Sequence, residues 1–170
     1  QVRHAAENGF SYIKTNPGGR LDVILQYGGM NGYYTWPRLG YDLELDAPGF
    51  PDSVRASIKR LNLDDDYDVK SVQDLLEIPD LELLPEYERE IRNKLKLLDQ
   101  KIGRLHKEPE KIGGLEWWKV YGRSLRDAKF DLSEGSRSLY VLHKYVEATK
   151  VKRGTKAFAK KDHMESTDKK

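Results

Sequence analysis

Hydrophobic and polar positions near the N-terminus alternate as they do in β-strands. Residues 9–15 form one such segment, and in residues 21–27 one face would carry Leu21, Val23, Leu25 and Tyr27. The sequence Asn-Pro-Gly-Gly at residues 16–19 is typical of a turn, because proline fixes φ and glycine accepts positive φ. The pattern predicts a β-hairpin.

A third strand is predicted at residues 41–45, where apolar and acidic residues alternate. Pro37 cannot donate to a strand ladder, so we expect residues 33–42 to be an interrupted strand, at a sheet edge or in a pocket wall. Together these segments predict a small, mostly antiparallel sheet.

Helical periodicity follows in three segments. Residues 51–61 carry an apolar stripe with Asp52 or Ser53 as the expected N-cap, and residues 71–78 form a shorter helix. Residues 85–105 give the clearest pattern, with a proline at the first helical position and apolar residues at intervals of three and four. A last helix is predicted after this region, towards the C-terminus.

The predicted fold class is α+β, in a single domain of residues 1–150. The small sheet is packed by the C-terminal helix of residues 134–150, for which Ser133 is the expected N-cap. Residues 63–109 are expected to be an inserted acidic helical excursion, because residues 44–100 contain fifteen Asp and Glu against eight Lys and Arg. Residues 151–170 are expected to form a flexible basic tail.

The composition excludes several classes of site. The 170-residue chain has no cysteine, which rules out disulfides, thiolate metal ligands and cysteine nucleophiles. Its four histidines are scattered, so we expect no metal and no other cofactor. The chain has no apolar run long enough to span a bilayer, so we expect no membrane partner and a cytoplasmic location, or a virion-associated one for a phage-derived protein. A start at Gln1 predicts a part of a larger polypeptide.

A basic run at the end of the chain is the first candidate binding feature. It consists of Lys150, Lys152, Arg153, Lys156, Lys160 and Lys161. Such a run can neutralise phosphates and would attract nucleic acid. The alternative is a solvated tail, because only one aromatic residue, Phe158, is available there for stacking.

Residues 28–45 are the second candidate, because they combine four glycines and four aromatic residues. The candidate ligand contacts in this segment are Asn31, Trp36, Arg38 and Asp42. In one interpretation Tyr34 and Trp36 are core residues and Arg38 pairs with an acid. In the other, aromatic walls from Trp36 and one of Trp117 or Trp118 hold Arg38, whose guanidinium faces an anion.

The start of the last helix is the third candidate. Ser136, Arg137 and Ser138 would offer hydroxyls, a guanidinium and free backbone N–H groups to an anion. The alternative is simple capping beside a surface arginine. Known catalytic motifs give no stronger signal. Residues 26–31 match the pyrophosphate-binding loop of acetyltransferases at Gln26 and Gly29 but have Asn31 in its last position, and Walker, CxxC and HExxH motifs are absent.

Three segments, "NGYYTWPRLGYD", "EWWKVYG" and "FDLSEGSRSLYVLHKY", resemble a domain of very large phage- and plasmid-encoded polyproteins, over residues 31–42 and 115–145. The resemblance implies a mobile-element protein that is deployed with DNA. It also implies that the two regions meet in space. The facing residues would then be Trp36, Arg38 and Asp42 on one side and Trp117, Trp118 and residues 136–138 on the other.

Two functions stay open at this point. One is a non-catalytic module that binds nucleic acid or a protein partner. The other is a group-transfer enzyme, acyl- or ADP-ribosyl-transfer-like, with a pocket between residues 31–42 and 115–138. The enzyme should place Arg38 and Ser136 in one concave site, whereas the binding module should show a continuous basic or aromatic face.

Overall fold

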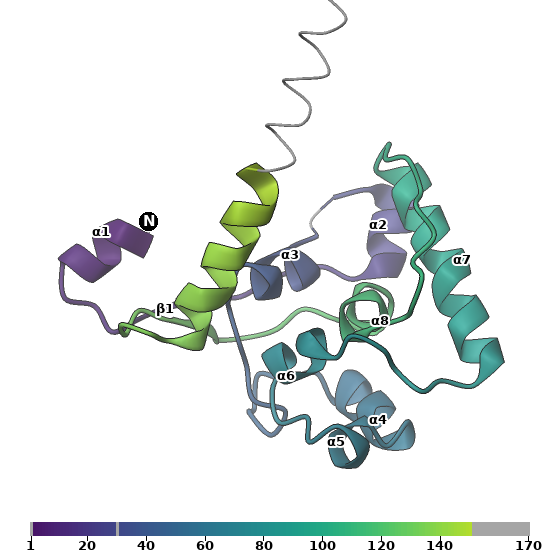
Figure 1. The fold of residues 1–170 in the computed structure, drawn as a ribbon, viewed down its shortest axis with the longest axis horizontal. Coiled ribbons are helices and arrows are strands. Elements are labelled where there is room, and N and C mark those ends of the chain that lie inside the picture. The colour runs from purple at the N-terminus through teal and green to yellow at the C-terminus, as the bar shows by residue number, and fades with distance from the viewer. Residues whose placement is uncertain (1, 30, 151–170) are drawn as a thin grey trace, which may run out of the picture.

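The structure is a computed structural model that describes residues 2–29 and 31–150. Its labelled elements are α1 (Val2–Glu7), β1 (Tyr12–Thr15), α2 (Leu21–Tyr27), α3 (Gly32–Arg38), α4 (Asp52–Arg60), α5 (Leu63–Asp66), α6 (Val72–Glu77), α7 (Pro85–Lys101), α8 (Gly114–Tyr121) and β2 (Ala128–Asp131). A further helix begins at residue 137 and reaches residue 150, the last described residue; it is the yellow-green helix without a label in Figure 1. The predicted class, a small α+β fold, is confirmed.

The sheet has two antiparallel strands that are far apart in sequence. β1 pairs with β2, with Tyr12 opposite Asp131 and Thr15 opposite Ala128. The predicted hairpin is wrong, because residues 21–27 form the helix α2. A short segment with several apolar residues fits both periods, and the core selects the helical one. Leu21 and Ile24 are buried on one helical face, whereas the predicted strand residue Tyr27 is 75% exposed.

Residues 41–45 do not form the continuous strand that their alternation predicts. Asp42 makes a single antiparallel bridge to Lys129 of β2, and Glu44 makes another to Ser71 at the start of α6. The segment thus changes partner after two residues, and this crossing ties the sheet to the helices.

Residues 32–38 form the helix α3, so the predicted interrupted strand is wrong. Pro37 lies in its last turn and cannot donate to the carbonyl of Tyr33, four residues earlier. That buried carbonyl accepts instead from the indole Nε1–H of Trp118, at 2.7 Å. A side chain of α8 therefore satisfies the backbone group that the proline leaves without a helical donor.

The middle of the chain follows its sequence pattern closely. α7 begins with Pro85 at the first helical position and buries Ile91, Leu95 and Leu98. α6 has a complete capping box, in which the Ser71 hydroxyl accepts from the backbone N–H of Asp74 and the Asp74 carboxylate accepts from the N–H of Ser71. The expected caps of α4 are wrong: Pro51 precedes this helix, and no side chain caps it.

α8 lies at the centre of the fold, seen end-on in Figure 1, and packs against α2, α6 and α7. Trp117 and Trp118 are fully buried there. Gly114 makes the close approach possible, because a Cβ at this position would overlap the carbonyl oxygen of Leu75 in α6. Residues 63–109 thus supply three helices, α5, α6 and α7, to the same core as the rest of the chain.

The last helix begins three residues later than predicted. Residues 133–136 form a turn, with the N–H of Ser136 donating to the carbonyl of Ser133 at 3.0 Å. Ser136 then acts as the N-cap, because its hydroxyl accepts from the N–H of Leu139 at 3.3 Å. Gly135 adopts a positive φ of 73° in this turn, and this conformation delays the helix.

Candidate functional site

The two tryptophans of α8 belong to the core and not to a surface site. The Trp118 ring lies 6.3 Å from that of Phe50, and the Trp117 ring lies 5.2 Å from that of Tyr121, measured between ring centroids. Because both side chains are 0% exposed, neither can contact a ligand at the surface. The expected tryptophan wall beside Arg38 is therefore not formed by α8.

Two other candidates lie at the edge of the core. Trp36 is half-buried and packs edge-on against Tyr41, with ring centroids 5.0 Å apart. Asn31 precedes α3, and its Nδ2 donates to the hydroxyl oxygen of Tyr34 at 3.0 Å. Tyr34 itself is 3% exposed. The interpretation of Tyr34 as a core residue is confirmed, and Asn31 contacts the polar end of its ring.

Arg38 is held by an aromatic ring, but by one that the sequence did not indicate. Its guanidinium carbon lies 5.6 Å from the centroid of the Tyr145 ring, on the helix of residues 137–150. No carboxylate among the described residues forms an ion pair with Arg38. A stacked guanidinium can still donate in its own plane, so Arg38 has the geometry of a ligand contact.

Asp42 is a structural junction. Its carboxylate accepts from the hydroxyl of Ser71 at 2.8 Å, from the N–H of Gln73 at 2.9 Å and from the N–H of Leu43 at 2.8 Å. Burial raises the pKa of Asp42, and these hydrogen bonds oppose that rise. Both oxygens of Asp42 accept hydrogen bonds from the protein, and these bonds fix the crossing segment to α6.

The helix start at residues 136–138 is also engaged by the protein. Arg137 Nη1 lies 2.5 Å from Asp74, and its Nη2 lies 2.9 Å from Glu77. The Ser138 hydroxyl accepts from the N–H of Asp131 at 3.0 Å. Partial burial is the largest single effect and raises the pKa of Asp74. The hydrogen bond and charge of Arg137, together with hydrogen bonds from the backbone N–H groups of Lys70 and Ser71, outweigh it, and the pKa is lowered. These contacts match the capping alternative and join the last helix to α6.

A small polar hollow, here called the basic hollow, lies beside Arg38 and has a volume of about 190 Å³. Its polar lining consists of Tyr34, Arg38, Asp99, Arg104, His106, Lys107, Glu116 and Lys119. Both acids are already paired: Asp99 lies 2.8 Å from His106, and Glu116 lies 3.4 Å from Lys119. Arg38, Arg104 and Lys107 have no such partner within the hollow, so its surface carries a positive charge.

Sequence reasoning did not identify the residues that α7 and its following loop bring to this hollow. The available signal was the run from Arg104 to Lys107, directly after the end of α7 at Lys101. His106 is held between Asp99 and Glu108, at 2.8 and 3.0 Å. The hydrogen bonds to Asp99 and then to Glu108 raise the pKa of His106. This clamp fixes the loop against α7.

A second hollow adjoins the first, because Arg38 lines both. It has a volume of about 280 Å³ and is here called the tyrosine hollow. Tyr140, Lys144 and Tyr145 of the last helix form one side of it. Tyr140 is 55% exposed, with the Lys144 ammonium 4.8 Å from its ring centroid. Basic and aromatic side chains therefore continue from one hollow to the next.

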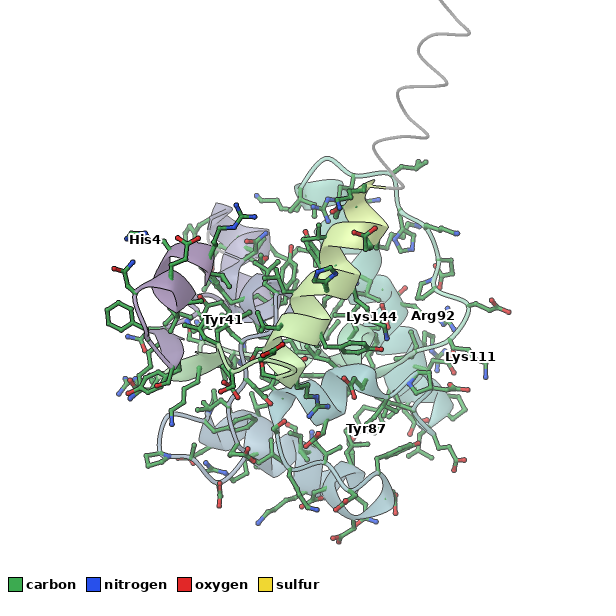
Figure 2. The ribbon with its side chains drawn as sticks, turned by 60° about the vertical axis from the view of Figure 1, so that its left-hand side comes forward. His4, Tyr41, Tyr87, Arg92, Lys111 and Lys144 are labelled. Carbon is green, nitrogen blue, oxygen red and sulfur yellow. The ribbon has the colours of Figure 1, made fainter. Side chains whose placement is uncertain are left out.

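Lys144 differs from other basic side chains that are labelled in Figure 2. Arg92 is held by Glu88 at 2.5 Å, and Lys111 by Asp80 at 2.6 Å. In the described part of the chain, Lys144 has no carboxylate partner of this kind. Its charge is available at the surface of the last helix.

Arg38 and Ser136 line different hollows. Ser136 borders a third one, of about 550 Å³, with Leu139 and His143. This hollow shares Tyr140 and Lys144 with the tyrosine hollow, but Arg38 does not line it. A pocket enzyme was expected to place Arg38 and Ser136 in one concave site, and none of these hollows contains both residues. A fourth hollow, of about 520 Å³, does lie between the two resembling regions, and Asp42, Lys129, Arg137 and Ser138 border it.

The two resembling regions do meet, as expected. Asp42 bridges to Lys129, and the Arg38 guanidinium lies over the Tyr145 ring. Gly40 lies so close to Ser138 that a Cβ at residue 40 would overlap the Ser138 carbonyl oxygen. Of the basic run, Lys150 is described and lies 2.9 Å from Glu147. Lys152, Arg153, Lys156, Lys160 and Lys161 lie outside the described residues.

Comparisons with family models, with curated proteins and with solved structures find no match. Over residues 2–29 and 31–150, no group of three or more His, Asp or Glu side chains is placed to hold a metal ion. The helices in those ranges include none that is long and apolar enough to cross a membrane. The site is therefore interpreted from its geometry and charge.

Proposed function

We propose that this chain is a nucleic-acid-binding module of a phage- or plasmid-type mobile-element polyprotein, and that it binds a single strand on the surface around Arg38. The observation that carries this proposal is the position of Arg38. Its guanidinium lies 5.6 Å from the Tyr145 ring centroid, without a carboxylate partner among the described residues, where two hollows adjoin.

The residues around Arg38 match the requirements of single-strand binding. Such surfaces combine a basic groove that follows the backbone with aromatic rings on which bases stack. Arg104, Lys107 and Lys144 supply positive charge on the two sides of Arg38. Tyr140 is more than half exposed and supplies a ring face. Because stacking accepts any base, this surface would bind with little sequence preference.

The sequence after residue 150 extends the same chemistry. The helix of residues 137–150 carries Tyr140, Lys144 and Tyr145, and the basic run starts at its last described residue, Lys150. Each phosphate that the run contacts would release counterions and strengthen binding at low salt. The resemblance of residues 31–42 and 115–145 to polyprotein domains is the support for the mobile-element assignment.

The test is the salt dependence of binding to a short single-stranded oligodeoxynucleotide, measured by fluorescence anisotropy on the full chain. Arg38→Gln should weaken binding several-fold and reduce the slope of log K against log salt by about 0.7, the value for one lost contact on a single strand. The matched control is Arg89→Gln on the outer face of α7, which should change neither quantity. Undetectable binding by the wild-type chain at low salt would contradict the proposal.

The basic run is tested in the same assay. Replacing all six basic residues from Lys150 to Lys161 by Gln should reduce the slope of log K against log salt by about 0.7 for each phosphate contact that is lost. An unchanged slope would exclude the run as a contact.

The hollow between residues 31–42 and 115–138 supports a group-transfer enzyme as the second candidate. Its volume of about 520 Å³ lies within the usual range of small-molecule sites. However, Asp42 and Arg137, which border it, are both engaged by protein groups. Calorimetric titration with coenzyme A and with NAD separates the candidates: tight binding of either that Arg38→Gln leaves intact would favour the enzyme.

A further inference from the structure

We infer that the basic hollow is a subsite for a phosphate monoester, and that the phosphate it takes is the one at the end of a nucleic-acid strand. This inference rests on the proposed function, whose surface it divides into a phosphate position and a base position. Three properties of the hollow carry it: its charge, a buried hydroxyl and its size.

The charge of the hollow is suited to a dianion. Its two acids are paired with His106 and Lys119 within the same hollow, at 2.8 and 3.4 Å. Arg38, Arg104 and Lys107 therefore provide positive charge that no acid of the hollow neutralises. A terminal phosphate carries a charge of about −1.5 to −2 at neutral pH, whereas each internal phosphodiester carries one negative charge. The positive charge of the hollow therefore stabilises a terminal phosphate more than an internal phosphodiester.

The buried hydroxyl belongs to Tyr34, which lines the hollow and is only 3% exposed. A phenol oxygen can accept and its proton can be donated. Here the oxygen accepts from Asn31 Nδ2 at 3.0 Å, and none of the hydrogen bonds found among the described residues uses the phenol proton. A buried hydroxyl without an acceptor is unfavourable, and a phosphate oxygen in the hollow would accept from it.

The basic hollow is the smaller of the two that adjoin at Arg38. Its volume of about 190 Å³ is sufficient for a phosphate group. The tyrosine hollow on the other side of Arg38 is larger, at about 280 Å³, and offers Tyr140 to a base. A strand end would thus place its phosphate in the basic hollow and its last base on the tyrosine side, with Arg38 between them.

His106 acts as a positioning residue in this arrangement. Both ring nitrogens are occupied, by Asp99 and by Glu108, so the imidazole is not free to bind the ligand. Its contacts hold the loop that carries Arg104 and Lys107 against α7. Loss of the clamp should therefore weaken phosphate binding through the position of these two side chains.

The experiment compares one oligodeoxynucleotide in three forms, with a 5′ phosphate, with a 3′ phosphate and with hydroxyls at both ends, by anisotropy on the full chain. One phosphorylated form should bind on the order of tenfold more tightly than the hydroxyl form. Tyr34→Phe should abolish this preference while leaving affinity for the hydroxyl form nearly unchanged. Lys107→Gln should also abolish the preference, and it should weaken binding of the hydroxyl form as well, because Lys107 belongs to the proposed strand-binding surface. The matched control, Lys96→Gln on the exposed side of α7, should retain the preference.

The outcomes separate this inference from the proposed function. If all three forms bind equally and Arg38→Gln still weakens binding, the phosphate subsite is wrong and the nucleic-acid surface stands. If no form binds, both are wrong. Displacement of the phosphorylated strand by a mononucleotide at equal concentration would support the phosphate site and assign it to a free nucleotide. Melting temperatures of the Tyr34→Phe and Lys107→Gln proteins show whether each variant is folded.

Discussion

The helices α3 and α7 are stabilised in different ways. α7 has seventeen residues, begins with a proline in the favoured first position and carries Glu88–Arg92 and Glu90–Lys94 ion pairs on its outer face. α3 has seven residues, includes Pro37 in its last turn and depends on Trp118, whose N–H satisfies the carbonyl of Tyr33. α7 is specified by neighbours in sequence, whereas α3 is specified by a residue 85 positions away.

This difference predicts that the largest loss of stability comes from replacing Trp118, whose indole N–H completes the hydrogen bonding of α3. Trp118→Ala removes a fully buried indole and leaves the Tyr33 carbonyl without its donor, so the free energy of unfolding should fall by about 3–5 kcal/mol. Leu97→Ala on α7 removes a side chain that is 51% exposed and should change it by less than about 0.5 kcal/mol. Urea denaturation measures both, and equal losses would contradict the comparison.

A smaller effect isolates the hydrogen bond itself. Trp118→Phe keeps an aromatic ring but loses the N–H, which should cost about 1–3 kcal/mol because a buried carbonyl is left without a donor. Pro37→Ala introduces a backbone N–H at the position from which a regular helix would supply that donor. In a double-mutant cycle, Trp118→Phe should therefore cost less when residue 37 is alanine. Additive free energies of unfolding would mean that the indole N–H does not replace the missing helical bond.

The same comparison explains which parts of the fold could be predicted from sequence. α4, α6 and α7 lie within their predicted ranges, because their periodicity and, for α6 and α7, the signals at their first residues are local. Residues 21–27 were predicted as a strand and residues 33–42 as an interrupted one, because their short apolar runs fit either period and Pro37 breaks the local helical pattern. Only contacts made after folding, such as that with Trp118, decide between the two.

The residues of the candidate site also differ in how far the sequence could predict them. Arg38 could be selected from sequence, because a cluster of glycines and aromatic residues around one arginine is unusual. Its partner Tyr145 could not be selected. The basic residues Arg104 and Lys107 are visible as a run in the sequence but could not be assigned to Arg38, because the distant helix and loop meet Arg38 only in the fold. Trp117 and Trp118 were selected for their aromatic character and belong to the core.

The smallest expected effect concerns the loop after α7, which local charges hold. His106 has a pKa raised above its ordinary 6.5 by Asp99 and then by Glu108, so its stabilising contribution is complete below about pH 6.5 and is lost as the pH rises through the raised value. Glu108 has a pKa lowered by His106 and then by Arg92. Its stabilising contribution is therefore present at neutral pH and is lost as the pH falls through the lowered value.

An NMR titration of the His106 ring measures this effect. The midpoint should lie above 6.5 in the wild-type protein and should move down in the Asp99→Asn variant. The wild-type melting temperature should also fall more than that of His106→Gln between about pH 6 and about pH 8. A wild-type midpoint at or below 6.5 would show that the loop is held without the charge of His106.

The most direct test of the central claim, that Arg38 contacts a ligand and is not a structural residue, compares Arg38→Lys with Trp36→Ala in stability and in strand binding. Arg38→Lys keeps the charge but loses the planar group that lies over Tyr145, so strand affinity should fall while the melting temperature stays nearly unchanged. Trp36→Ala removes a half-buried ring from Tyr41 and should lower the melting temperature. If Arg38→Lys lowers the melting temperature as much as Trp36→Ala and leaves strand affinity intact, Arg38 is a structural residue and the proposed surface is wrong.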